Sequence, residues 1–292
     1  MKIFITGGSG FIGRNLVEYL KSKYEVFAPT HKELELLNES AVSEYFNRNK
    51  FDVVIHGAVR PGHRNAKDSS NQLYNNLRMF FNMVRNSEKF GKLIFLSSGA
   101  VYDTTRAMAK VKEGDFDTCV PKDEHGFSKY AIAKHIERIN NAVELRIFGI
   151  FGKYEDYAIR FISNAICKTL LDLPITIKQN RKLGYLYIDD LMQIVDYFIS
   201  SDSTYKAYNV TPDESMELAI LAEKVKNVLG KNMPVLINEK AIGIEYSGDN
   251  SRLRKEITGF KFTPIDLAIE KLYQWYAENK HLINKELLLT DK

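Results

Sequence analysis

The chain has 292 residues and a mass of 33.6 kDa, enough for one large α/β unit or two modest domains. Hydrophobic residues make up 45% of it and charged residues 27%, which excludes a disordered chain, a collagen-like repeat and a coiled-coil rod. The net charge of +4 comes from interspersed basic and acidic residues, so nucleic acid is not expected as a partner.

Cysteine content and hydropathy indicate the cellular compartment in which the protein is expected. The two cysteines, Cys119 and Cys167, lie far apart in sequence and cannot make a disulfide framework, which is typical of a reducing compartment. No apolar stretch reaches the roughly 18 residues of a membrane span, and the first apolar run is too short for a signal peptide. We therefore expect a cytoplasmic protein with no membrane partner. A metal site is not expected either, because the histidines and cysteines show no metal-ligand spacing.

Short apolar runs and segments of helical period alternate through the first half of the chain. The run KIFIT at 2–6 has no helical period, whereas apolar positions recur at three- and four-residue steps from Ile12 to Leu20. The alternation predicts an α/β fold with a doubly wound parallel sheet and helices on both faces. The predicted strands are 2–6, 24–28, 52–56, 92–98 and 143–148, and the predicted helices are 11–23, 39–50, 70–89 and 127–141, with polar stretches at 60–70 and 103–124.

The pattern becomes looser beyond about residue 155. It predicts helices at 157–171, 189–200, 215–229 and 264–279, and strands at 174–178 and 207–210. No clean linker, internal repeat or low-complexity segment divides the sequence. Any second domain is therefore expected to be interleaved with the first.

The segment between the first strand and the first helix is a glycine-rich turn. Thr6–Gly13 (TGGSGFIG) carries glycines at positions 7, 10 and 13. Such glycines permit a tight turn, let the backbone approach a pyrophosphate, and leave that phosphate at the positive end of a helix. A plain glycine-rich turn is the alternative, but the strand-turn-helix context favours dinucleotide binding. A Walker-type phosphate loop is excluded, because no Gly-Lys-Ser/Thr follows.

The end of the second strand bears on the choice between NAD and NADP. An acidic side chain there would bind the adenosine ribose, whereas a cation there would meet a 2′-phosphate. The strand ends in Ala28 and Pro29 without an acid, and His31 and Lys32 follow shortly after. Arg14, at the start of the first helix, can add to the positive field. The sequence favours NADP and leaves NAD open.

Two further segments carry candidate catalytic groups. Tyr130 and Lys134 lie four residues apart on a predicted helix, so the phenol and the ammonium share one face. A nearby ammonium stabilises the phenolate, so this tyrosine can exchange a proton with a sugar hydroxyl or a ketone. Ser97 and Ser98 stand where a predicted parallel strand ends, and open α/β sheets bind ligands at that edge.

Taken together, these segments resemble the extended short-chain dehydrogenase/reductase family, which includes nucleotide-sugar epimerases, dehydratases and ketoreductases. The resemblance covers most of the chain. It rests on TGGSGFIG at 6–13, HGA at 56–58, Asn76, SSGAVY at 97–102, YAIAK at 130–134, LRIFGIFG at 145–152 and YLYIDDL at 185–191.

The resemblance implies a Rossmann-type sheet with a smaller, interleaved C-terminal substrate domain. Residues 1–155 would bind NAD(P), and residues 156–292 would mainly bind substrate, with about 180–210 returning to the first domain. The helices at about 70–89 and 127–141 would form a homodimer interface. Bacterial surface-polysaccharide synthesis is the pathway that the family suggests.

The resemblance also implies roles for single residues. Ser98 matches the catalytic hydroxyl, Tyr130 the acid/base and Lys134 its partner. The residues expected to bind the cofactor are Gly7, Gly10, Phe11, Ile12, Gly13, His31, Lys32, Ala58, Asn76, Ser97, Tyr130, Lys134 and Phe148, and those expected to bind substrate are Ser98, Gly99, Tyr130 and Arg181.

Details of the motifs separate the subgroups of the family. Dehydratases usually carry an Asp-Glu pair where this chain has Gly99 and Ala100, so dehydration is not expected. The stretch at 30–42 is similar to GDP-fucose synthases, which reduce with NADPH and also epimerise. The cysteine needed for that epimerisation falls on Ala100, and the segment 149–175 has no histidine to serve as its acid. Only the reductive half is carried over.

Two positions depart from the family pattern. Gly149 replaces a usual asparagine, and residues 245–247 lack the arginine expected before the Gly-Asp at 248–249. A guanidinium suits a diphosphate, and Arg181 is the preferred candidate. The other available cations are Lys182, Arg252 and Arg254.

Three hypotheses for function remain open. The first is a reductase in which NADPH delivers hydride to a 4-keto deoxysugar nucleotide and Tyr130 donates the proton. The second is a 4-epimerase that uses tightly bound NAD and the same three residues. The third is a non-catalytic dinucleotide-sensing protein, which the intact Ser98, Tyr130 and Lys134 set disfavours.

Overall fold

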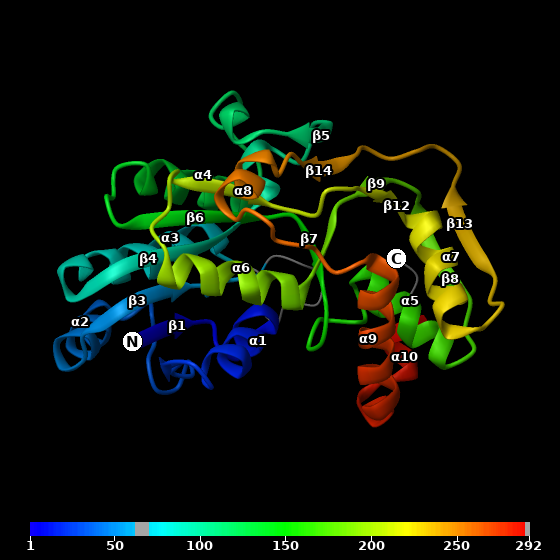
Figure 1. Ribbon diagram of the computed structural model, residues 1–292, viewed down its shortest axis with the longest axis horizontal. Helices are drawn as coiled ribbons and strands as arrows, with labels where there is room; N and C mark the ends of the chain where they lie inside the picture. The colour runs from blue at the N-terminus through cyan, green and yellow to red at the C-terminus, as the bar shows by residue number, and fades with distance from the viewer. Residues whose placement is uncertain (62–69, 290–292) are drawn as a thin grey trace.

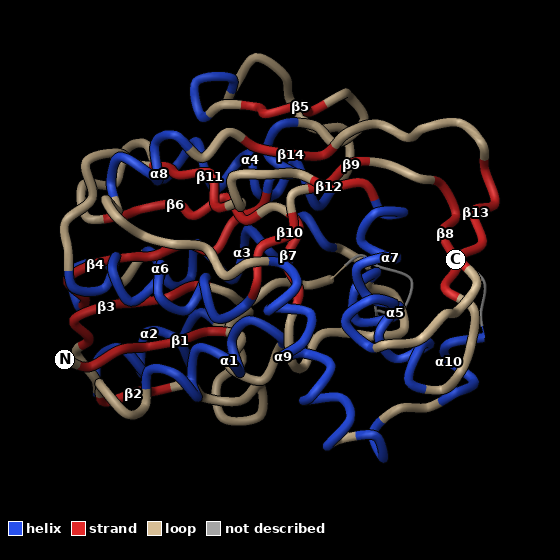
Figure 2. The backbone as a smooth tube through the Cα atoms, turned by 45° about the vertical axis from the view of Figure 1, so that its right-hand side comes forward, coloured by secondary structure: helices blue, strands red, loops and turns tan. Residues whose placement is uncertain are grey.

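Six parallel strands form the main sheet of the protein, for which the computed structural model describes residues 1–61 and 70–289. The strands lie in the order β11-β6-β4-β3-β1-β2, and Figure 2 shows β6 to β2 as a stack of neighbours. Their bounds are β1 Lys2–Thr6, β2 Glu25–Phe27, β3 Phe51–His56, β4 Phe90–Ser98, β6 Ala142–Ile147 and β11 Ala207–Val210. All five adjacent pairs are parallel, which confirms the predicted fold class.

Helices cover both faces of this sheet because side chains alternate along each strand. On β1, Ile3 and Ile5 pack in one buried cluster with the helices α1 (Phe11–Leu20) and α6 (Ile188–Ser200). Phe4 points the other way and packs in a second cluster with the helices α2 (Glu39–Arg48), α3 (Gln72–Val84) and α4 (Glu124–Ile136). Figure 1 shows α6 lying in front of the strands, with α1 below it.

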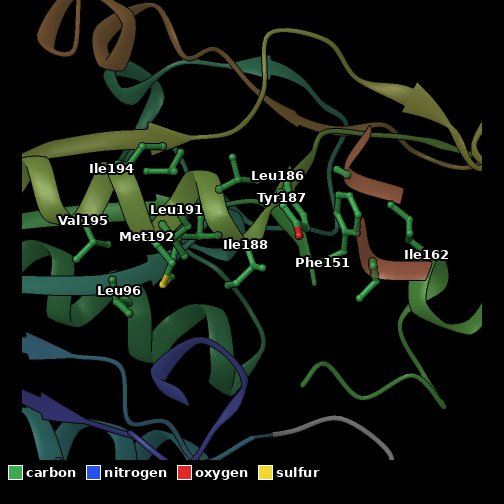
Figure 3. Close-up of a cluster of buried hydrophobic side chains, with 14 of the residues drawn as sticks. Leu96, Phe151, Ile162, Leu186, Tyr187, Ile188, Leu191, Met192, Ile194 and Val195 are labelled. Carbon is green, nitrogen blue, oxygen red and sulfur yellow. The ribbon is translucent and has the colours of Figure 1, made fainter. Parts of the chain in front are cut away.

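The cluster around α6 joins the sheet to the rest of the molecule. Figure 3 shows side chains of α6 and of the short strand β10 (Tyr185–Tyr187) packed toward Phe151, Ile162 and Leu96. All of these side chains are buried. Burial of one such side chain contributes about 1.5–3 kcal/mol, so this contact holds the two parts of the chain together.

The remaining elements build three small sheets and a helical group. Figure 1 shows α5, α7, α9 and α10 grouped beside the main sheet, with β8 and β13 at the outer edge. The small sheets have the orders β10-β7, β12-β9-β14-β5 and β13-β8. The bounds are β5 Met108–Val111, β7 Gly149–Phe151, α5 Phe161–Leu170, β8 Ile175–Gln179, β9 Lys182–Leu183, β12 Met216–Glu217, α7 Leu218–Leu229, β13 Val235–Glu239, β14 Tyr246–Gly248, α8 Ser251–Glu256, α9 Ile265–Glu278, α10 Lys285–Leu289, and the 3-10 turns η1 Ser87–Lys89, η2 Gly99–Tyr102, η3 Glu113–Asp115 and η4 Lys280–Leu282.

The predicted elements exist, with shifts at their ends. Helix α4 begins at Glu124 rather than at 127, and the segment expected to be a loop at 103–124 contains β5. The short strands β7, β9, β10, β12, β13 and β14 were not predicted. Most of the polar stretch at 60–70 lies outside the described residues. None of the helices in the described ranges is long and apolar enough to cross a bilayer.

The strand order places a ligand crevice between β1 and β3. From β1 the chain runs to β2 on one side, and then returns to β3 on the other. Connections that leave in opposite directions open a crevice at the carboxyl ends of the two strands, where open α/β sheets bind ligands. The next strand, β4, ends beside β3, since His56 pairs with Phe95.

Candidate active site

The glycine-rich turn after β1 has the close backbone approaches that its sequence predicts. Gly7 has a φ of +75°, and a Cβ there would lie 2.9 Å from the amide nitrogen of Ala58. A Cβ on Gly13 would collide with the carbonyl oxygen of Gly7. Any side chain at either position would therefore move the backbone that forms the floor of the crevice. The turn fits a pyrophosphate at the beginning of α1.

A cavity of about 450 Å³ opens over this turn, a size typical of ligand pockets. The expected cofactor residues that line it are Gly7, Gly10, Phe11, Ile12, Gly13, His31 and Ala58. Lys32, Asn76, Ser97, Tyr130, Lys134 and Phe148 are not among the lining residues. Glu35, Arg60 and Asn75 line the cavity although they were not predicted.

The rim beside β2 is charged. The imidazole of His31 is exposed and lies 3.0 Å from the carboxylate of Glu35 on the next turn of the chain. Arg14 turns away from this rim, since its guanidinium lies 3.7 Å from the ring centre of Tyr154 and pairs with Glu18. Among the three predicted cations, His31 alone lines the cavity.

The serine segment ends β4 and turns into η2. The Ser98 hydroxyl caps this turn by accepting a hydrogen bond from the Ala100 amide at 3.2 Å. The hydroxyl of Ser97 is buried and finds no hydrogen-bond partner among the described residues. A buried hydroxyl without a partner is rare in proteins, and it fits a ligand that approaches the end of this strand.

Helix α4 brings Lys129 to the sheet, with His125 one turn before it. Asp123 starts the helix by accepting a hydrogen bond from the Gly126 amide at 2.8 Å. The Lys129 ammonium is buried beneath the end of β4, where it donates to the carbonyl oxygen of Leu96 at 3.1 Å. Burial lowers the pKa of Lys129 to about 8. One turn earlier, burial and the Lys129 charge lower the pKa of His125 to about 4, so this imidazole is neutral at pH 7.

The structure does not bring Tyr130 and Lys134 to Ser98, which corrects the expected catalytic set. The Tyr130 hydroxyl donates to Asp117, and the Lys134 ammonium pairs with Asp117 at 3.0 Å and with Glu137 at 2.9 Å. The reason is the register of the helix, because successive residues point about 100° apart. Lys129 faces the sheet, and Tyr130 therefore faces the loop that carries Asp117.

The correct register is visible in the apolar pattern of α4. Ile132, Ala133 and Ile136 are buried, and they share a face with His125 and Lys129 at steps of three and four residues. Helix α4 contains two pairs in which a lysine follows a ring-bearing side chain by four residues. The first pair is His125 and Lys129, and the second is Tyr130 and Lys134. The second pair contains the tyrosine, but only the first pair fits the buried stripe.

Asn76 ties the neighbouring helix to this site. It is buried on α3, and its side-chain oxygen accepts a hydrogen bond from the Arg60 amide at 2.7 Å. Its amide nitrogen lies 3.5 Å from the hydroxyl of Ser128, next to Lys129. Asn76 thus links the wall of the cavity to α4.

Tyr246 reaches the end of β4 from the C-terminal part of the chain. Its hydroxyl lies against Gly99, the residue that follows Ser98, and its ring lies 5.1 Å from the ring of Phe148. Burial raises the pKa of Tyr246 to about 12, while Ser98 and the charges of Arg181 and Arg160 act in the opposite direction. The sequence pattern did not single out Tyr246 or Arg160.

The predicted substrate cation Arg181 therefore belongs to the electrostatic surroundings of Tyr246. Arg252 and Arg254 are engaged elsewhere. Arg252 donates to the carbonyl oxygen of Ala207 at 3.1 Å, and Arg254 pairs with Asp213.

A buried polar network supports the strand next to β4. Arg146 and Glu144 form an ion pair of 2.8 Å on β6, and both side chains are 2% exposed. Arg146 also donates to the Tyr102 hydroxyl at 2.8 Å, and that hydroxyl donates to Asn209 at 2.7 Å. The network connects the turn after Ser98 to β6 and β11, so it holds the carboxyl end of the sheet in place.

Comparisons with known proteins agree with this architecture. GDP-L-colitose synthase of Yersinia pseudotuberculosis is 24% identical, over 96% of this chain and 99% of its own length. The dTDP-4-dehydro-6-deoxyglucose reductase of Escherichia coli is 25% identical, over 92% and 96% of the two chains. A solved GDP-mannoheptose C4 reductase from Campylobacter jejuni with NADP bound superimposes with a TM-score of 0.81 at 24% identity, covering 94% of this chain and 98% of that one.

The family profile gives the membership directly. The profile of the NAD dependent epimerase/dehydratase family matches residues 3–211, which includes the glycine-rich turn, the serine segment and α4. This match confirms the resemblance to the extended short-chain dehydrogenases/reductases. The chain therefore belongs to the NAD dependent epimerase/dehydratase family.

Proposed function

We propose that the protein is an NADPH-dependent reductase of a 4-keto deoxysugar nucleotide. One observation carries the proposal: β4 ends in the Ser98 hydroxyl, and the buried Lys129 ammonium donates to the carbonyl oxygen of Leu96 two residues earlier on this strand, which lies directly beside the strand that borders the glycine-lined cavity. A dinucleotide bound in that cavity supplies the hydride for reduction.

The residues of the chain have separate tasks in this reaction. The turn at Gly7–Gly13 would hold the pyrophosphate, and Lys129 would hold the nicotinamide ribose as a cation. The Ser98 hydroxyl would bind the keto oxygen of the sugar. Arg160 and Arg181 would attract the diphosphate of the substrate, since a guanidinium matches phosphate geometry. Residues 1–155 would then form the dinucleotide domain and 156–292 mainly the substrate region, with about 180–210 returning, as the pairing of β11 with β6 supports.

The substrate class follows from the relatives. GDP-L-colitose synthase and dTDP-4-dehydro-6-deoxyglucose reductase are both named for sugars linked to a nucleoside diphosphate. Their names differ in the base, so the proposal extends to the sugar nucleotide and leaves the base to experiment. NADPH is favoured over NADH because His31 lines the cavity at the end of β2 and Lys32 follows it.

The first experiment measures cofactor binding and turnover with the same protein. We expect purified protein to carry no tightly bound NAD and to bind NADPH more tightly than NADH in a fluorescence titration. It should then oxidise NADPH when given dTDP-4-dehydro-6-deoxyglucose or its GDP-linked counterpart. Tightly retained NAD together with interconversion of 4-epimers would replace this proposal by the epimerase. Binding of NADPH without turnover on either ketone would favour the dinucleotide-sensing protein.

We also propose that α3 and α4 form a homodimer interface. Tyr74 and Phe81 on α3 and Phe127 on α4 are exposed apolar side chains, with exposed fractions of 63%, 38% and 37%. Light scattering after size-exclusion chromatography tests this directly. Tyr74→Lys is expected to shift a dimer toward monomer, and a wild-type monomer at micromolar concentration would disprove the interface.

A further inference from the structure

We propose that Tyr246 is the catalytic acid of this site and that its phenol, which approaches Ser98 from β14, gives the proton to the keto oxygen. The inference rests on the proposed reductase function. It assigns the donation of the proton to a residue in the C-terminal part of the chain, and not to helix α4, which carries Lys129.

Helix α4 offers no phenol to the reaction. The residue one turn before Lys129 is His125, and its neutral imidazole carries no extra proton to donate near pH 7. The phenol of Tyr130 is on another face of the helix, where its hydroxyl donates to Asp117 and its ring lies 5.4 Å from Phe116. A phenol that donates to the keto oxygen must therefore come from another element.

Tyr246 lies where that donor is needed. Its hydroxyl lies against Gly99, the residue that follows Ser98, so the phenol and the Ser98 hydroxyl can hydrogen-bond to one substrate oxygen. Gly99 makes this approach possible, because a Cβ there would lie 2.6 Å from the Tyr246 hydroxyl and 2.7 Å from the Phe148 ring. The absence of a side chain at position 99 thus leaves the space that the phenol enters.

The backbone of Tyr246 is fixed from both sides. Its carbonyl oxygen accepts a hydrogen bond from the Gly184 amide at 3.3 Å, and the neighbouring Glu245 carbonyl accepts one from the Met108 amide at 3.1 Å. The Ser247 hydroxyl accepts a hydrogen bond from the Lys110 amide at 2.9 Å. β14 therefore sits between β5 and β9, and the phenol is presented by a rigid element rather than by a loose loop.

The ketone receives its hydride and its proton from two different donors. The keto carbon accepts hydride from the bound dinucleotide, the electron pair of the C=O π bond moves to the oxygen, and that oxygen takes the proton of the Tyr246 hydroxyl. The phenolate that remains is stabilised by the Ser98 hydroxyl and by the charges of Arg181 and Arg160, and it regains a proton from water. A phenol whose pKa is about 12 stays protonated at neutral pH, while an alkoxide is the stronger base and accepts the proton.

The test compares three variants with the wild type, using NADPH and dTDP-4-dehydro-6-deoxyglucose or its GDP-linked counterpart. Tyr246→Phe is expected to lower kcat about 100-fold or more, the usual loss for a general acid. Its affinity for NADPH, measured by fluorescence, should stay within about twofold of the wild type, because the substitution removes one oxygen outside the dinucleotide cavity. Tyr130→Phe is the matched control and should leave both quantities unchanged. His125→Gln should retain most of the turnover.

A second readout requires no substrate. NADP⁺ brings a positive charge to this end of the sheet, which should lower the pKa of the neighbouring phenol. At pH 9.5 its addition should give a tyrosinate difference absorbance near 295 nm in the wild type and in Tyr130→Phe, but not in Tyr246→Phe.

The outcomes separate this inference from the proposed function. Full turnover by Tyr246→Phe, or a loss confined to His125→Gln, would overturn the role of Tyr246 and leave the reductase intact. A wild type that binds NADPH but reduces neither ketone would overturn the reductase and the inference with it.

Discussion

The candidate site has two parts, the glycine-rich turn after β1 (the β1 end) and the residues around the end of β4 (the β4 end). The two parts are formed in different ways, and sequence patterns predict them unequally well. At the β1 end, the glycine-rich turn is contiguous, and its backbone contacts follow from the spacing of Gly7, Gly10 and Gly13. At the β4 end, Ser98, Lys129 and Tyr246 come from three distant segments. The comparison teaches that a contiguous motif fixes its own geometry, whereas a composite site depends on which helix face meets the sheet.

The largest effect is expected from the buried ion pair that supports the β4 end. Arg146→Met leaves Glu144 charged and unpaired in the interior, which should lower the free energy of unfolding by about 3–5 kcal/mol. Urea denaturation followed by circular dichroism measures this. Arg48→Met, which breaks an exposed pair on α2, is the matched control and should cost less than about 0.5 kcal/mol. Equal losses in the two variants would contradict a supporting role for the network.

The two lysines of α4 test which face of this helix contributes to catalysis. Lys129→Met should lower kcat/KM for the keto sugar about 100-fold, because it removes the cation buried beneath the end of β4. Lys134→Met removes a cation that pairs with Asp117 and Glu137 away from the site, and should change kcat/KM less than twofold. A larger effect of Lys134→Met would mean that the face of α4 that carries Lys134, and not the face that carries Lys129, serves catalysis.

A side chain in the glycine-rich turn tests the other end of the crevice. Gly13→Ala brings a methyl group into the carbonyl oxygen of Gly7, and should weaken NADPH binding about 30-fold, or roughly 2 kcal/mol. Gly114→Ala is the control, because no atom beyond the adjoining backbone lies within 4 Å of the added methyl group. The NADPH fluorescence titration reads out both variants. An unchanged affinity in Gly13→Ala would show that the turn is not the pyrophosphate site.

The pH dependence of cofactor binding tests Lys129 in a different way. Burial holds the pKa of this ammonium at about 8, below its usual 10.5, so the group is charged at pH 7 and loses its charge as the pH rises through about 8. NADPH affinity should therefore fall severalfold between pH 7 and 9 in the wild type. Lys129→Met should bind weakly and lack this step, and a step that persists in the variant would assign it to another group.

The smallest effect is expected at the rim beside β2. His31→Ala and Lys32→Ala should each reduce the preference for NADPH over NADH about two- to fivefold, because exposed charges interact weakly in water. The ratio of the two dissociation constants is the measurement. Glu35→Gln should raise the preference, since it removes the anion that pairs with His31 at 3.0 Å. A fall in preference would indicate that Glu35 binds the ribose hydroxyls.

The fold was predictable to a large extent because its signals are local. Apolar runs and helical period located the six strands of the main sheet, of which the strand at 207–210 lies far along the chain. The short strands β5, β9 and β14 escaped prediction, since segments of two to four residues carry no period of their own. These three strands pair with one another, and the middle one, β14, carries Tyr246.

The sheet, the glycine-rich turn and the serine at the end of β4 could be located from the sequence alone, because each depends on residues that are neighbours in the chain. The tertiary structure was needed to show which face of α4 meets the sheet and which phenol lies next to the end of β4. The physical reason is that one face of an amphipathic helix must be buried, and the choice of face depends on the partners that cover it. His125 and Lys129 share that face with Ile132 and Ile136, and so Tyr130 points away.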